Sequence, residues 1–377
     1  MWTSWQTRCG IASYTASLVE SLRTLGVEVD VVPVPYTERG PSREAETITR
    51  LNAADLVHVQ HEYTFFGGIA PTSSSLPRYY RQLTVPRVVT AHTVFTAAEL
   101  LRVAHETRWR QWIAKELLSR YPPYRDYVER QPFAGARAII VHTDAARDRL
   151  AARRLPEESI HVLPAGVPAA AEASAAAIEA FRNRFRLGGH RVATIFGYVT
   201  ADKGYETALD ALKKLPPMIK LLIAGGTRVE RERGYLEQLR ETIRSSGLES
   251  RVVITGFLEE DEIAAAMGAT DVVLVPHLTA NGSYSVMVAL GHGKPVLASD
   301  LPCFREIAAQ SPCVELFPPE DEYALADRMG LLMASSGIRS RMATDARNYA
   351  QERSWGTVAE KTLALYRQAL RPDRKNG

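Results

Sequence analysis

The sequence is poor in cysteine and has no long apolar run. Among its 377 residues are only three cysteines, Cys9, Cys303 and Cys313, which are too few and too scattered for a disulfide framework or a zinc site. No stretch approaches the roughly 20 apolar residues that a membrane-spanning helix needs. The first residues lack the basic and apolar regions of a signal peptide. These absences favour a reduced, cytoplasmic setting.

An excess of charge of one sign is also missing. The 46 Lys and Arg residues nearly balance the 43 Asp and Glu residues, which leaves a net charge of +3. So small a charge gives no indication of a nucleic-acid partner. The composition is that of an ordinary globular protein, and the chain is long enough for two domains.

Short β-branched runs alternate with longer amphipathic stretches, a pattern typical of βα units around parallel sheets. Strands are predicted at residues 28–33, 55–60, 87–91, 138–142, 160–163, 192–196, 219–224, 252–255, 272–275 and 295–298. A strand before Gly10 is expected to be short, and the sequence leaves open whether it is complete. The Ala-rich segment 169–186 separates the two series. We therefore predict an α/β chain of two doubly wound, Rossmann-like domains, with ligands at the carboxyl ends of the strands.

The first chemical motif runs from Gly197 to Gly204, after a predicted strand and before a helix. A glycine lets the backbone approach a ligand closely, and Lys203 adds a positive charge suited to a diphosphate. The alternative is a plain βα turn with a solvated lysine.

The second motif lies before another predicted helix. Small and polar residues at a helix start can offer backbone N–H groups to anionic oxygens, although Ser283 or Ser285 can equally be an N-cap. The motif consists of Asn281, Gly282, Ser283, Tyr284 and Ser285. A third element, residues 293–300, is a turn into a buried strand.

Taken in this order, these elements resemble the donor half of glycosyltransferase family 4, the retaining GT-B enzymes. The matching segments are Gly197 with Lys203 and Gly204, then 222–226, 282–284 and 291–298. The resemblance implies two Rossmann-like domains facing each other across a cleft. It implies that residues 1–168 form the acceptor-side domain, with a helical insertion around 98–130, and that 169–354 bind the nucleotide-sugar. Residues 355–377 would form a terminal helix crossing back to the first domain.

The amino-terminal half resembles the same family. Segment 8–14 looks like its glycine-rich first turn, which would place Gly10 near the donor phosphates. Segment 89–93 resembles the segment whose histidine, here His92, faces the transferred sugar. Segment 55–62 would place His61 and Glu62 on the acceptor side. A histidine bonded only for structure is the alternative for His92 and His61, and the favoured interpretation for His58.

The chain departs from the family at the glutamate pair expected near positions 280 and 288, where Ala280 and Val288 stand. Tyr198 replaces the usual arginine, and Glu306 matches a later glutamate. The resemblance therefore implies catalytic roles for His92 and Lys203. The implied donor-binding residues are Gly10, Gly197, Tyr198, Lys203, Asn281, Gly282, Ser283, Tyr284, Ser285 and Glu306.

The expected reaction is retaining transfer from a nucleoside-diphosphate sugar, a UDP- or GDP-sugar first, to an acceptor hydroxyl. No Asp-x-Asp occurs, so no metal is expected, and no cofactor. The acceptor is a small molecule, a glycan or a lipid-linked sugar. Residues 98–130 are rich in cations and aromatics, which is compatible with contact to an anionic membrane. The acidic residues among them favour instead a partly buried helix pair that shapes the acceptor cleft.

Two other classes remain as alternatives. An NAD-dependent oxidoreductase needs a G-x-G-x-x-G fingerprint, which neither Gly67-Gly68 nor Gly225-Gly226 supplies. A non-catalytic binding or partner protein that lost the glutamates is the stronger alternative. Hydrolysis of a nucleotide-sugar in the absence of acceptor would distinguish an enzyme from it.

Overall fold

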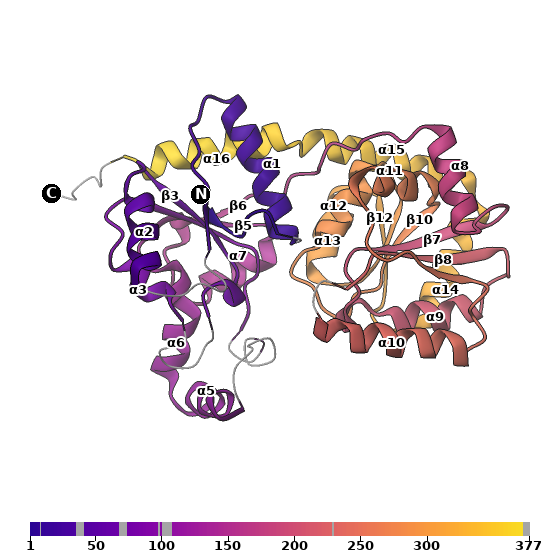
Figure 1. Cartoon of the computed structure of the whole chain (residues 1–377), viewed down its shortest axis with the longest axis horizontal. Coiled ribbons are helices and arrows are strands. Elements are labelled where there is room, and N and C mark those ends of the chain that lie inside the picture. Colours follow the sequence, from indigo (N-terminus) through magenta and orange to yellow (C-terminus); the bar gives the residue numbers. More distant parts are fainter. Residues whose placement is uncertain are drawn as a thin grey trace. The chain divides into compact units, whose positions relative to one another are not determined.

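The computed structural model describes residues 1–7, 9–34, 41–67, 74–96, 99, 108–227 and 230–371. The chain forms two compact units, Met1–Ala165 with Trp355–Gly377, and Gly166–Ser354. Each contains a six-stranded sheet (Figure 1). Some predicted residues lie outside the described part. They are Arg8 of the first turn, residues 98 and 100–107 of the insertion, and residues 372–377 of the terminal segment.

The sheet of the first unit is parallel and has the strand order β2-β1-β3-β4-β5-β6. The strands are β1 (Trp2–Thr3), β2 (Val32–Pro33), β3 (Val57–His61), β4 (Arg87–Ala91), β5 (Ala136–Val141) and β6 (Ile160–Val162). The helices are α1 (Gly10–Thr24), α2 (Pro41–Asn52), α3 (Leu76–Tyr80), α5 (Arg108–Arg120), α6 (Pro122–Arg130), α7 (Asp144–Ala151) and α16 (Trp355–Ala369).

The sheet of the second unit is also parallel, with the order β12-β11-β10-β7-β8-β9. The strands are β7 (Arg191–Phe196), β8 (Ile219–Ala224), β9 (Val252–Ile254), β10 (Val272–Val275), β11 (Val296–Ser299) and β12 (Val314–Phe317). The helices are α8 (Ala175–Arg184), α9 (Tyr205–Lys213), α10 (Glu230–Ser245), α11 (Glu260–Ala269), α12 (Tyr284–Gly291), α13 (Pro302–Gln310), α14 (Glu322–Ala334) and α15 (Ser336–Glu352), with the 3₁₀ turn η4 (Ala201–Lys203).

The central strands form where the sequence offers continuous apolar runs. Every residue of β8 and β10 is buried, as expected for parallel strands that helices cover on both faces. The α/β class with two Rossmann-like sheets is therefore confirmed.

One predicted strand was too long and one strand was missed. The segment predicted as 28–33 pairs only at Val32–Pro33, because it carries Glu28 and Asp30 and forms a sheet edge, where a proline is tolerated. Strand β12 was not predicted, since its four residues include a glutamate and give a weak apolar signal. Helix α12 begins at Tyr284 rather than after the serine motif.

Helix α16 completes the core of the first unit, and it lies beside α1 (Figure 1). Its side chains Trp355, Val358 and Tyr366 are buried with Leu18 and Leu22 of α1. The ring of Trp355 meets the ring of Tyr14 edge-on, with centroids 4.8 Å apart.

Candidate functional site

The turn after β7 brings together three of the residues expected at the donor site. Gly197 has a φ of 110°, a conformation that favours glycine. A Cβ atom placed on Gly197 would lie 2.8 Å from Lys203 Nζ and 2.8 Å from Ser285 Oγ. The lysine of η4 and the serine of α12 therefore meet at one point of the backbone.

Lys203 is held in place by the backbone. Its Nζ donates a hydrogen bond to the carbonyl of Phe196 at 3.1 Å. Burial lowers the pKa of Lys203 to about 8, although the nearby carboxylate of Asp202 opposes this change. A partly desolvated ammonium is stabilised by an incoming anion more than a fully hydrated one is.

Close backbone packing fixes this turn. Gly204 has a φ of +66°, and a Cβ there would lie 1.9 Å from the carbonyl oxygen of Pro276. The N–H of Leu278 donates to the carbonyl of Asp202 at 2.8 Å. A Cβ on Gly225 would likewise lie 1.9 Å from the carbonyl oxygen of Gly197. No side chain larger than hydrogen fits at Gly204 or Gly225 without a backbone shift.

The start of α12 is the second part of this half-site. Ser283 is its N-cap, in an extended conformation, and the serine side chain makes no capping hydrogen bond. A helix start of this kind favours anionic ligands. Gly282 is exposed, whereas Asn281 and Tyr284 are half-buried.

The remaining donor-side predictions fall on neighbouring elements. The carbonyl of Tyr198 accepts a hydrogen bond from the hydroxyl of Tyr205 at 3.5 Å. Glu306 lies half-buried on α13, the helix that follows β11. Their roles in donor binding stay predictions.

His277 was missed by the sequence analysis. It comes two residues after the end of β10, and its ring meets Phe304 edge-on with centroids 5.9 Å apart. Its buried Nδ1 has no hydrogen-bond partner among the described residues. Burial, with a further effect of Lys203, lowers the pKa of His277 to about 3. Its place at the carboxyl end of a central strand is the signal that could have identified it.

In the first unit, His92 follows β4 and meets His142, which follows the neighbouring strand β5. His92 Nε2 donates to Oε1 of Gln60 at 2.8 Å, and His142 Nδ1 donates to the carbonyl of Leu163 at 3.0 Å. The facing nitrogens, His142 Nε2 and His92 Nδ1, are 3.4 Å apart. Burial is the main cause that lowers the pKa of both rings. Both ring nitrogens of His92 therefore face partners within this unit.

His58 is a structural histidine. Its Nδ1 lies 2.5 Å from the hydroxyl of Tyr366 and its Nε2 lies 2.7 Å from Oγ1 of Thr90. These contacts join β3, β4 and α16, and burial lowers the pKa of His58 to about 3.

His61 and Glu62, predicted on the acceptor side, differ in position. His61 is only 1% exposed and packs against the rings of Tyr63, Phe66 and Phe133. Glu62 accepts hydrogen bonds from the N–H of Tyr63 at 3.0 Å and from Oγ1 of Thr93 at 2.6 Å. His61 thus lies in the core, and Glu62 braces the segment that follows His92.

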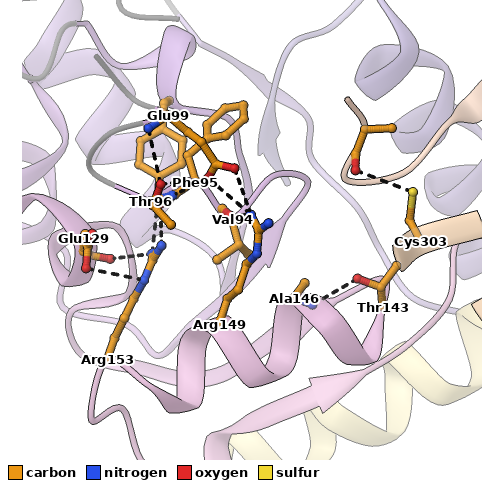
Figure 2. A network of polar contacts seen from close by, with 12 residues as sticks. Val94, Phe95, Thr96, Glu99, Glu129, Thr143, Ala146, Arg149, Arg153 and Cys303 are labelled. Carbon is orange, nitrogen blue, oxygen red and sulfur yellow. Dashed lines mark hydrogen bonds and ion pairs between the residues drawn. The ribbon is translucent and has the colours of Figure 1, made fainter. Parts of the chain in front are cut away.

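Two arginines of the α7 region hold the same segment (Figure 2). Arg149 donates to the carbonyl of Val94 at 3.0 Å and pairs with Glu99 at 3.2 Å. Arg153 donates to the carbonyl of Phe95 and, at 3.1 Å, to that of Glu129. The backbone beyond His92 is therefore anchored by charge-assisted hydrogen bonds.

Gly10 opens α1 after Cys9, which is its extended N-cap. Within the described residues, no group of three or more His, Cys, Asp or Glu side chains could hold a metal ion. In that same part of the chain, no helix combines the length and the apolar character needed to cross a membrane.

Comparison with known proteins identifies the family. Residues 178–351 match the family model for glycosyl transferases group 1, and residues 45–171 match that for Glycosyltransferase Family 4. The chain belongs to glycosyltransferase family 4. In solved structures, the Anabaena protein HepE, in complex with UDP and glucose, superimposes on this family 4 chain with a TM-score of 0.73. The two are 18% identical, and the match covers 97% of this chain and 98% of HepE. This likeness supports the GT-B fold class.

Curated relatives carry related activities in their names. The D-inositol 3-phosphate glycosyltransferase of Xylanimonas cellulosilytica is 28% identical over 66% of this chain and 61% of its own length. The phosphatidyl-myo-inositol mannosyltransferase of Mycolicibacterium smegmatis is 26% identical over 95% of this chain and 89% of its own length. The first curated relatives are matched over less than two thirds of their length, at 61%, 46% and 66%.

Proposed function

We propose that this family 4 protein transfers a sugar from a nucleoside-diphosphate sugar to an acceptor hydroxyl, with retained configuration and without a metal ion. The observation that carries the proposal is the meeting of Lys203 Nζ and Ser285 Oγ over Gly197, both 2.8 Å from a Cβ placed there. A cation, a hydroxyl and a helix start at one backbone turn make a suitable diphosphate site.

In the proposed reaction, the bond between the anomeric carbon and the diphosphate oxygen breaks, and negative charge develops on that oxygen. Lys203 and the start of α12 stabilise this charge, and removal of one such donor costs about 3 kcal/mol of barrier. The acceptor oxygen bonds to the anomeric carbon on the face that the diphosphate leaves. Its proton passes to the departing diphosphate.

The proposed donor is a UDP- or GDP-sugar, and the proposed setting is the cytoplasm. The solved structures of HepE with UDP and with UDP-glucose support a nucleotide-sugar as donor. Since Ala280 and Val288 replace the glutamate pair, the ribose must be bound by other groups. The acceptor is a small molecule, a glycan or a lipid-linked hydroxyl.

Calorimetry with UDP, GDP, ADP and TDP tests the donor site. We expect one nucleotide to bind with micromolar affinity, and Lys203→Ala to lose at least about 1.5 kcal/mol of binding free energy. Lys213→Ala is the matched control, because Lys213 is exposed on α9 and pairs with Asp210. Failure of all four nucleotides to bind would contradict the proposal.

A non-catalytic partner protein is the second candidate, and the replaced glutamate pair is the observation that favours it. Nucleotide binding alone does not separate the two candidates. Slow hydrolysis of the matching nucleotide-sugar, lost in Lys203→Ala but kept in Lys213→Ala, would support the enzyme. Tight binding without any turnover, with or without acceptors, would support the partner protein.

A further inference from the structure

Helix α5 carries aromatic side chains on the face that points away from the core. Ile113, Ala114, Leu117 and Leu118 form its buried or half-buried side. On the solvent-facing side, Trp109 and Trp112 are 60% and 64% exposed. A surface helix of a globular protein normally carries polar residues on that side. Two exposed tryptophans one turn apart are the mark of an interaction surface.

The connection to α6 extends this aromatic surface. Tyr121, between the two helices, is 55% exposed, and Tyr127 of α6 is 51% exposed. The rings of Tyr124 and Tyr127 stack with centroids 6.3 Å apart. Helices α5 and α6 pack against each other, and Figure 1 shows them at the lower end of the first unit. We name this the α5–α6 surface.

Cations accompany these aromatics. The exposed basic residues of the surface are Lys115, Arg120, Arg125 and Arg130. Of the three acidic residues in the two helices, Glu116 pairs with Arg120 at 3.0 Å and Glu129 with the buried Arg153 at 3.8 Å. Asp126 is exposed, whereas Glu116 and Glu129 are half-buried. Positive charge therefore exceeds negative charge on the surface that meets solvent.

We propose that the α5–α6 surface binds an anionic membrane. Tryptophan and tyrosine rings insert at the level of lipid headgroups, and neighbouring lysines and arginines attract anionic lipids. The exposure of Trp109 and Trp112 favours a surface that receives these rings over a helix pair whose largest aromatic side chains are buried. The segment that leads to α5 follows His92 at the carboxyl end of β4. Bound in this way, the protein would take a lipid-linked acceptor, a step that rests on the proposed function; membrane binding itself does not.

Co-sedimentation of the full chain with vesicles tests the surface. We expect binding to vesicles of phosphatidylcholine mixed with phosphatidylglycerol, weak binding to phosphatidylcholine alone, and loss of binding at high salt. The double variant Trp109→Ser/Trp112→Ser should weaken binding at least about tenfold. Arg120→Gln/Arg125→Gln should weaken it roughly thirtyfold.

The controls make the same changes elsewhere. Tyr323→Ser removes an exposed aromatic of α14, and Arg240→Gln/Arg244→Gln removes two exposed, paired cations of α10. Both should bind vesicles like the unaltered protein. All altered side chains are exposed, so unchanged melting temperatures confirm that the variants fold. Absence of binding to the anionic vesicles, equal binding to both vesicle types, or undiminished binding by the tryptophan variant would each overturn the proposal. Nucleotide binding, measured on the same samples, reports on the donor site separately.

Discussion

His142 Nε2 and His92 Nδ1 face each other at 3.4 Å, a separation longer than a normal hydrogen bond between nitrogens. The other nitrogen of each ring, His92 Nε2 and His142 Nδ1, explains this long separation. Leu163 and Gln60 present carbonyl oxygens, which can only accept, so each imidazole directs its single proton outward. Burial lowers the pKa of both rings. The neutral pair thus has two lone pairs facing each other and no proton between them.

Gln60→Glu should draw a proton into this pair. The change keeps the shape of the side chain and replaces an amide by a carboxylate beside His92 Nε2, which should raise the pKa of His92. A pH titration of the histidine ring nitrogens by NMR measures this pKa. The control is Gln82→Glu, the same change at an exposed position. A charged His92 in the unaltered protein at neutral pH would contradict the interpretation.

His61→Phe should change the free energy of unfolding at neutral pH by no more than about 1 kcal/mol. The buried Nδ1 of His61 has no hydrogen-bond partner among the described residues, so an apolar ring in its place among the aromatic neighbours leaves no group unsatisfied. Burial lowers the pKa of His61 to about 3, against about 6.5 when unfolded. The stability contributed by neutral His61 is fully present above the pKa of the unfolded state. It declines as the pH falls from that pKa towards the pKa of the folded state.

When the pH falls from 7 to 5, the free energy of unfolding of the variant should therefore decrease by about 2 kcal/mol less than that of the unaltered protein. Urea unfolding at both values measures the difference. Phe133→Leu, a change in the same aromatic cluster that removes no titrating group, should lower stability equally at the two pH values. Transferase activity decides the predicted acceptor role: the buried position predicts retained activity in His61→Phe, and loss of activity without loss of stability would restore that role.

Much of the fold could be predicted from the sequence because parallel strands buried on both faces read as continuous apolar runs. The prediction succeeded at β8 and β10, and it failed at β2 and β12, where the sheet ends and the apolar signal is diluted. Edge strands are short and partly solvated, so their limits depend on their neighbours more than on local composition.

The contacts within the candidate site were harder to predict from the sequence than the strands. Lys203 and Ser285 belong to separate motifs, and their meeting over Gly197 depends on β10 lying beside β7. His92 and His142 meet because Ala91 pairs with Val141 in the sheet. Register of this kind is decided by packing across the whole sheet. A single residue such as His277 gives no local sign of the partners it will have.

Gly204→Ala and Gly247→Ala separate backbone strain from steric contact. Both glycines have a φ of +66°, but a Cβ at Gly247 meets nothing within 4 Å, whereas at Gly204 it meets the carbonyl oxygen of Pro276 at 1.9 Å. Gly247→Ala should cost about 1 kcal/mol of unfolding free energy. Gly204→Ala should cost at least about 3 kcal/mol. Equal losses in urea unfolding would show that the turn after β7 can move away from the segment after β10.

The pKa of Lys203 makes nucleotide affinity depend on pH in a defined direction. The diphosphate binds the charged ammonium, and in the free protein burial lowers the pKa of Lys203 to about 8. Affinity should be constant below that pKa and fall above it, by about tenfold between pH 7 and pH 9.

Lys203→Arg is the informative variant, because a guanidinium stays charged over this range. Its affinity should be nearly independent of pH, even if it is lower than that of the unaltered protein at pH 7. Calorimetry with the same nucleotide measures both slopes, so any titration of the ligand cancels in the comparison. In buffers of different ionisation enthalpy at pH 8.5, the unaltered protein should take up a proton on binding and the arginine variant should not. Equal slopes in the two proteins would mean that Lys203 does not contact the diphosphate.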